Sequence, residues 1–224
     1  WRYFDSYLAR WGYPADKVTW IPQFADLSRL PPELPSEPEG GQFTVMYTGG
    51  HVHTMGIDVI LRAASILQSR SVDNVRFVFV GSGQEKPSLV KLAEELRLRN
   101  AEFRDPLTKD KLYDLMAEAN AFIISLRGLP HHQYGVCTNK ICDYLAMRRP
   151  IIYATLSSYN PVREAGLGFS PPPESPEGIA DAVIGLMAKS SAERRAMGER
   201  AYQYMLKYHE RMCMVDRLEK VLGM

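Results

Sequence analysis

The chain has 224 residues, of which 46% are hydrophobic and 24% charged, close to the average for globular proteins, so long disordered regions are excluded. Its 27 basic and 26 acidic residues give a net charge of +1, without the basic excess typical of nucleic-acid-binding proteins. No apolar run approaches the roughly 20 residues that a transmembrane helix needs, and no signal peptide is visible. These properties fit one large domain, or one domain with extensions.

The cysteines and histidines do not predict a metal site. Cys137, Cys142 and Cys213 form no CxxC pair, which disfavours both a disulfide framework and a zinc site and favours a reducing, cytoplasmic compartment. His51 and His53 have no carboxylate or cysteine nearby at ligand spacing, so we expect them to be surface or loop-packing residues.

In chain order, residues 1–12 predict a helix, residues 18–21 a short strand, and the Pro-, Gly- and acid-rich stretch 30–41 a linker. Apolar strands then alternate with amphipathic helices. The predicted strands are 43–48, 75–80, 101–103, 121–126 and 150–154. The predicted helices are 57–64, 89–96, 108–119, 138–146, 180–187 and 192–222.

This alternation predicts an α/β fold: a Rossmann-like, doubly wound parallel sheet covered by helices on both faces. The predicted organisation is a preceding region and linker over 1–40, the Rossmann-like domain over 41–205, and a final helix over 206–224. Ligands of such sheets bind beyond the carboxyl ends of the strands, so the loops there contain the candidate residues.

Three of these loops are weakly informative. Gly49 and Gly50 would let a ligand approach the backbone, but their spacing matches neither a dinucleotide fingerprint nor a P-loop. Gly81 lies in a loop that suits a nucleotide lying across the strand ends. In both loops a simple tight turn is an equal alternative. The backbone around Arg104 could read the edge of a base, or be an ordinary loop.

The loop that leads into the helix at 138–146 is the most informative. Thr138 is a suitable N-cap, and the N–H groups and dipole of a helix N-terminus favour phosphate. Lys140 would add positive charge there, and Asp143 lies on the same face as Asn139 and Lys140. A carboxylate one turn deeper can accept hydrogen bonds from the vicinal hydroxyls of a ribose. The alternative is a capped helix with a solvated Asp143.

Taken together, these segments resemble the C-terminal domain of the family-4 (group 1) glycosyltransferases, which have the GT-B fold. The similar segments are KVTWIPQFAD at 17–26 (kv.viPNGvD in the family), YTGG at 47–50 with MGID at 55–58 (y.Gr....KGld), VGSG at 80–83 (vGdGp) and DYLAMRRPII at 143–152 (EamA.GkPvi). The resemblance covers nearly the whole chain.

The sequence also departs from that family at several positions. The family's phosphate-binding Arg falls on Gly50, its Lys falls on Met55, and its pair of carboxylates falls on Gly135 and Asp143. The segment TNKICDYLA resembles PSKlfeYmA, found in a subgroup linked to amino-deoxysugar transfer onto bacterial surface polysaccharides, such as N-acetyl-fucosamine transferases. We therefore interpret Lys140 as a replacement phosphate ligand.

The resemblance implies a donor-binding half-enzyme. It would transfer a sugar from a nucleoside-diphosphate sugar, UDP-linked, to a glycan or lipid-linked acceptor at the cytoplasmic membrane face in bacterial surface polysaccharide synthesis. The anomeric configuration would be retained, with no metal or other cofactor. Its partners would be the donor and an N-terminal acceptor domain, to which residues 1–40 and the crossover helix 206–224 would connect.

The expected donor-binding residues are Gly49, Gly50, Gly81, Arg104, Thr138, Asn139, Lys140 and Asp143. No catalytic residue is assigned, because the groups that face the acceptor are expected largely in the other half. Two alternative functions remain open: a nucleotide-sugar epimerase of the same architecture, and a non-catalytic nucleotide-binding module.

Overall fold

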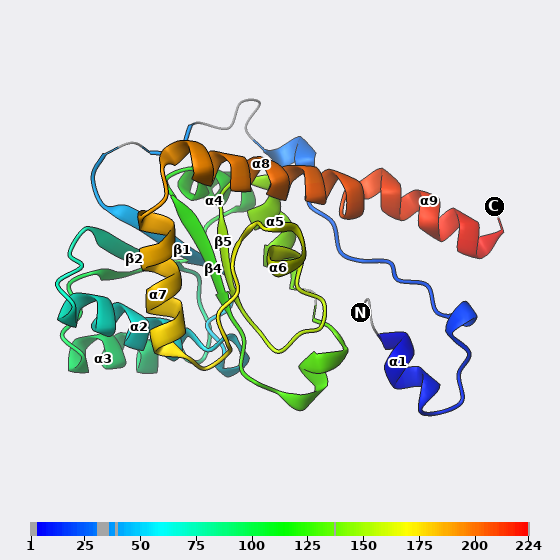
Figure 1. Ribbon diagram of the computed structural model, residues 1–224, viewed down its shortest axis with the longest axis horizontal. Helices are drawn as coiled ribbons and strands as arrows, with labels where there is room; N and C mark the ends of the chain where they lie inside the picture. The colour runs from blue at the N-terminus through cyan, green and yellow to red at the C-terminus, as the bar shows by residue number, and fades with distance from the viewer. Residues whose placement is uncertain (1–3, 31–35, 39, 137, 224) are drawn as a thin grey trace.

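The computed structural model describes residues 4–30, 36–38, 40–136 and 138–223 (Figure 1). Cys137, parts of the predicted linker and the first three residues of the predicted N-terminal helix lie outside the described residues. The centre of the fold is a parallel sheet of six strands in the order β3-β2-β1-β4-β5-β6. The strands are β1 (Phe43–Thr48), β2 (Val75–Val80), β3 (Ala101–Arg104), β4 (Ala121–Ser125), β5 (Ile151–Ala154) and β6 (Gly168–Phe169).

Two helical layers cover the sheet. One apolar core lies against α2 (Ile57–Ser69), α3 (Lys86–Glu95) and α7 (Pro176–Met187). The other lies against α4 (Lys109–Met116), α5 (Asn139–Ala146) and α8 (Ser191–Tyr208). Every residue of β1, β4 and β5 is buried, as expected of parallel strands between two helical layers. The predicted doubly wound, Rossmann-like fold is therefore confirmed.

The strand order locates the most favourable ligand position. From β1 the chain winds outward to β2 and β3, and then returns to the other side of β1 with β4, β5 and β6. The carboxyl ends of β1 and β4 thus flank the point at which the winding direction reverses, where ligands of doubly wound sheets bind. The loop at 49–56 and the loop that leads into α5 both start from this point.

The predicted strand over 18–21 is wrong. The segment is extended but does not pair with the sheet. Its backbone carbonyls, and those just after it, accept hydrogen bonds from side chains of the C-terminal region and not from a neighbouring strand. Arg217 Nη1 donates to the Trp20 carbonyl at 3.4 Å, and His209 Nδ1 lies 2.7 Å from the Gln23 carbonyl. An apolar, β-branched sequence fitted this extended conformation without a sheet partner.

The predicted helix over 192–222 is interrupted. α8 ends before His209, and a new helix, α9 (Arg211–Leu222), begins with Glu210 as its N-cap. The carboxylate of Glu210 accepts from the backbone N–H groups of Met212 and Cys213, which starts a new helix after the two non-helical residues His209 and Glu210. The short helices α1 (Phe4–Ala9) and α6 (Pro161–Ala165) complete the fold, and the sequence did not predict α6 or β6.

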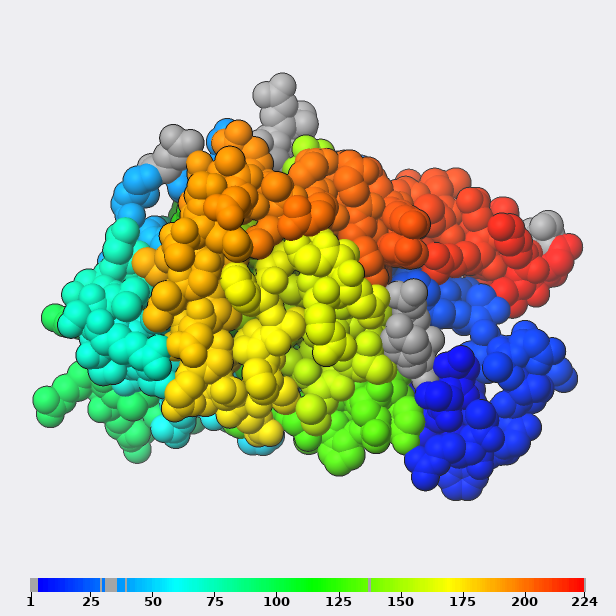
Figure 2. All heavy atoms as spheres, viewed as in Figure 1, coloured from blue at the N-terminus to red at the C-terminus, as the bar shows by residue number. Residues whose placement is uncertain are grey.

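The two ends of the chain stand apart from the sheet. α8 and α9 run nearly end to end, and α9 projects beyond the main body on the side where α1 also lies (Figure 2). Among the residues that the structure describes, no helix combines the length and the apolar character needed to cross a bilayer.

Candidate functional site

The loops after β1 and β2 are joined through their backbones. Gly49 N–H donates to Val80 O at 2.9 Å, and His51 N–H donates to Ser82 O at 2.8 Å. A Cβ on Gly81, whose φ is +144°, would lie 2.0 Å from the carbonyl oxygen of Gly49. The glycine at 81 is therefore required by the close approach of the two loops, independently of any ligand.

Lys140 extends from the first turn of α5 toward the end of β1, across the switch point. Its ammonium donates to the Tyr47 hydroxyl at 3.2 Å, and lies 3.2 Å from Met55 Sδ and 4.8 Å from the centre of the Tyr47 ring. Among the described residues, no carboxylate lies within ion-pair distance of this ammonium. Burial lowers the pKa of Lys140 to about 8. A partly buried cation without an anionic partner is a strong reason to expect an anionic ligand.

Of Gly49 and Gly50 in the first loop, only Gly49 makes room for this lysine. A Cβ on Gly49, whose φ is +121°, would lie 3.1 Å from Lys140 Cε, so a side chain there would crowd the lysine. Gly50 accepts a hydrogen bond from the Tyr47 hydroxyl at 2.7 Å through its carbonyl. The space around its own Cβ position is open, with only Val52 Cγ1 at 3.9 Å.

Thr138 occupies the N-cap position of α5, but its side chain does not cap the helix as the sequence predicted. The Thr138 hydroxyl is buried and has no hydrogen-bond partner in the described part of the chain. Without a side-chain cap, the first N–H groups of α5 keep their capacity to bind an anion. The helix end thus presents two kinds of polar group that lack a partner, its first N–H groups and the Thr138 hydroxyl.

An open hollow of about 530 Å³ lies beside this helix end. It is lined by Pro22, Gln23, Phe24, Asp26, Lys109, Asn139 and Asp143. Its lining thus comes from the segment 22–26, from the start of α4 and from the first two turns of α5. Asn139 and Asp143 share the hollow, as their helical spacing predicted, whereas the Lys140 ammonium points around the helix toward β1.

Asp143 is buried and doubly hydrogen-bonded, so the alternative of a solvated carboxylate is wrong. Lys109 Nζ lies 2.6 Å from one carboxylate oxygen, and the Tyr113 hydroxyl donates to the other at 2.8 Å. The Asp143 side chain remains 12% exposed within the hollow. Since each carboxylate oxygen has two lone pairs, both can still accept hydrogen bonds from a ligand.

Arg104 contributes its backbone and not its side chain to this edge of the sheet. Its guanidinium is held by Glu102, with Nε to Oε1 at 2.6 Å, and lies 3.9 Å from the carboxylate of Glu118. Its carbonyl accepts from Gly81 N–H at 3.1 Å and from Lys86 Nζ at 3.1 Å. The described contacts do not bring this side chain together with α5.

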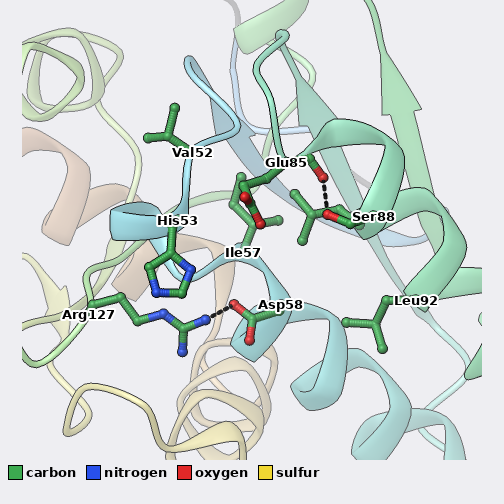
Figure 3. A pocket seen from close by; sticks show the side chains of 9 residues that line it. Val52, His53, Ile57, Asp58, Glu85, Ser88, Leu92 and Arg127 are labelled. Atoms are coloured by element: carbon green, nitrogen blue, oxygen red, sulfur yellow. Dashed lines mark hydrogen bonds and ion pairs between the residues drawn. The ribbon is translucent and has the colours of Figure 1, made fainter.

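A second, smaller hollow of about 190 Å³ lies between the starts of α2 and α3 (Figure 3). Arg127 is bound there to Asp58 at 2.6 Å, beside the exposed His53.

His51 is fully buried and packs edge-on against Phe103 with 6.0 Å between ring centres, so the expectation of a packing residue is confirmed for it. Among the described residues, no three His, Cys, Asp or Glu side chains are grouped as a metal site would require.

Sequence reasoning missed Tyr47, Lys109 and the wall 22–26. Tyr47 belongs to a fully buried strand, so its pattern matches that of a core aromatic residue. Lys109 could have been found, because it begins a helix directly after the loop that follows β3. The segment 22–26 lies more than 80 residues before Lys109 in the chain, and only the fold brings the two together.

The sequence matches the family described as "Glycosyl transferases group 1" over residues 42–189. A search of curated proteins gave no match.

Several solved structures are similar in fold. Sucrose-phosphate synthase from Thermosynechococcus elongatus superimposes with a TM-score of 0.77 at 18% identity, over 99% of this chain and 56% of that one. HepE from Anabaena, in complex with UDP and glucose, superimposes with a TM-score of 0.76 at 13% identity, over 98% of this chain and 60% of that one. A mutant of TarM from S. aureus, in a complex that includes UDP, superimposes with a TM-score of 0.66 at 14% identity, over 86% of this chain and 38% of that one. The chain thus spans less than two thirds of each of these proteins.

Proposed function

Because the chain belongs to the group 1 glycosyl transferases, we propose that the carboxyl edge of its sheet, between β1 and β4, binds the nucleoside diphosphate of a sugar donor. The observation that carries this proposal is the Lys140 ammonium, which is partly buried at the switch point and contacts a phenol and a thioether. A diphosphate would supply the missing negative charge.

The donor's phosphates are proposed to lie over the start of α5, between the Lys140 ammonium and the first N–H groups of the helix. The Thr138 hydroxyl, which lacks a partner in the described residues, would donate to the same anion. Gly49 and Gly50 would line this position. When the sugar is transferred, these groups would stabilise the negative charge that develops on the leaving diphosphate.

The nucleoside is proposed to occupy the hollow between α5 and the segment 22–26. Asp143 would accept hydrogen bonds from the ribose hydroxyls with the lone pairs that Lys109 and Tyr113 leave available. The exposed ring of Phe24 would offer an apolar contact for the base. We propose uridine as the base, with UDP bound in the HepE and TarM complexes as the support.

The whole protein is proposed to transfer an amino-deoxysugar from the UDP-linked donor to a glycan or lipid-linked acceptor of a bacterial surface polysaccharide, with retention of configuration. The resemblance of the segment at 138–146 to that subgroup supports this assignment. The acceptor would be held by an N-terminal domain connected through residues 1–40 and the helix at 206–224, at the cytoplasmic face of the membrane.

Calorimetric titration of the protein with UDP and with uridine tests the donor site. We expect UDP to bind at least about tenfold more tightly, because charge-assisted hydrogen bonds contribute about 1.5–3 kcal/mol. The UDP affinity should be the same with and without a chelator, since Lys140 and the helix end would neutralise the diphosphate. Equal affinity for UDP and uridine would refute a diphosphate site, and loss of UDP binding on chelation would refute metal independence.

A further inference from the structure

His209 lies at the break between α8 and α9, where the chain leaves helical geometry for two residues, His209 and Glu210. Its imidazole is fully buried. One ring nitrogen, Nδ1, lies 2.7 Å from the carbonyl oxygen of Gln23, and the other, Nε2, lies 2.7 Å from the hydroxyl of Tyr159. A side chain at the end of one helix therefore holds the backbone of a segment 186 residues earlier in the chain.

The Gln23 carbonyl is held from two directions. Besides the His209 contact, the thiol of Cys142 donates to the same oxygen at 3.3 Å. Cys142 is the neighbour of Asp143 on α5, and Gln23, Phe24 and Asp143 line the same hollow. One carbonyl oxygen thus joins the wall of the hollow to α5 and to the α8–α9 junction.

The Gln23 contact requires a hydrogen on Nδ1, and the neutral imidazole that carries this hydrogen satisfies both contacts. Since a carbonyl can only accept, Nδ1 must donate to Gln23, and Nε2 then accepts from Tyr159. Burial lowers the pKa of His209, with a further contribution from the charge of Arg217, so the neutral form is favoured. Trp20 closes the cluster with its ring edge-on to His209, 6.0 Å between centres.

We propose that His209 is a positioning residue for donor binding: by holding the Gln23 carbonyl, it fixes the wall of the hollow that receives the nucleoside. His209 does not itself line the hollow, and it acts through its contact with Gln23 in segment 22–26. This inference rests on the proposed function of the hollow.

Two substitutions separate the contacts of the ring. In His209→Asn the amide nitrogen can occupy the position of Nδ1 and keep the Gln23 contact, whereas in His209→Gln it can reach only the position of Nε2, toward Tyr159. Both remove a buried ring, so both should lower the melting temperature. We expect His209→Gln to weaken uridine and UDP binding alike by about 5- to 20-fold, and His209→Asn by less than about threefold. Equal affinities in the two variants would overturn the proposal.

Amide hydrogen exchange supplies a readout that needs no ligand. In His209→Gln we expect faster exchange at the backbone amides of segment 23–26 than in His209→Asn, with unchanged exchange in the central strands. If wild-type protein does not bind UDP, the proposed function fails while this difference in exchange still tests the positioning contact. Identical exchange of the segment in the two variants would show that His209 does not hold the wall.

Discussion

Lys86 and Lys140 occupy comparable places at the same edge of the sheet, yet their ammonium groups have different surroundings. Each lies in the first turn of a helix that follows a central strand, Lys86 in α3 and Lys140 in α5. Lys86 donates to the carbonyls of Gly81 and Arg104, both at 3.1 Å, and lies 2.7 Å from the carboxylate of Asp105. Lys140 has a phenol and a thioether as neighbours.

The difference separates a structural lysine from a ligand-binding one. The charge of Lys86 is compensated within the fold, and its contacts join the loops after β2 and β3. No described residue compensates the charge of Lys140, and its ammonium lies at the switch point of the sheet. The position of a lysine in a helix's first turn is therefore insufficient to predict its role, and the identity of its partners decides.

The largest effect is expected from Lys140→Met. UDP binding should weaken by about 10- to 100-fold, because a charge-assisted contact of about 1.5–3 kcal/mol is lost, while uridine binding should change little. Calorimetry with both ligands measures the two effects. Equal weakening of UDP and uridine would indicate a disturbed helix and not a lost phosphate contact.

A reciprocal exchange provides the control for that experiment. Because the Lys140 ammonium lies 3.2 Å from Met55 Sδ, the double variant Lys140→Met with Met55→Lys should return a cation to nearly the same place. We expect UDP affinity within about fivefold of the wild type. If the double variant binds UDP no better than Lys140→Met alone, charge at this position is not what the ligand recognises.

Lys86→Met should change stability instead of ligand selectivity. The partly buried carbonyl of Gly81 would lose its lysine donor and that of Arg104 would keep only the Gly81 N–H, so we expect the free energy of unfolding to fall by about 1–2 kcal/mol. The ratio of UDP to uridine affinity should stay within about twofold of the wild-type value. Chemical denaturation and calorimetry measure these quantities, and a selective loss of UDP affinity would contradict the distinction between the two lysines.

The pH dependence of UDP binding should show the Lys140 titration. Its pKa is lowered to about 8 in the ligand-free protein, and a bound phosphate favours the charged form and so raises that pKa. The affinity for UDP is therefore highest well below pH 8 and falls as the pH rises through the pKa of Lys140. At pH 9 we expect it to be about tenfold weaker. Lys140→Met should lack this dependence, and a wild-type affinity that stays constant between pH 7 and pH 9 would argue against the assignment.

A smaller gain is expected from Gly50→Arg. The backbone of Gly50 is not in the left-handed region and its Cβ position is open, so a side chain fits there. A second cation facing the same diphosphate should tighten UDP binding by about three- to fivefold, with uridine unaffected. Unchanged or weaker UDP binding by a folded variant would mean that Gly50 does not face the phosphates.

The sequence predicted the sheet and its helices well, because continuous apolar strands and amphipathic helices follow directly from burial between two layers. It predicted the wrong structure for residues 18–21, since an extended segment held by Arg217 and His209 has the same apolar pattern as a strand. The sequence also predicted α8 and α9 as one helix, because the break between them depends on the buried position of His209 and on the cap provided by Glu210.

The candidate site was predictable only in part. Spacing along α5 placed Asn139 and Asp143 in the same hollow, yet it could not show that Lys140 points toward Met55 or that Lys109 pairs with Asp143. The side chain of Arg104 illustrates the same limit, because Glu102 and Glu118 hold it away from the loops after β1 and β4. These orientations depend on neighbours that the fold alone brings into contact.

The backbone contacts between the first two loops have a consequence for the thermodynamics of ligand binding. The hydrogen bonds of Gly49 and His51 continue the pairing of β1 with β2 beyond the strand ends, and a Cβ on Gly83 would lie 2.3 Å from the His51 carbonyl. These loops are therefore ordered before any ligand arrives. Binding at this edge avoids most of the conformational entropy cost, about 1–2 kcal/mol per residue, that ordering a flexible glycine loop would require.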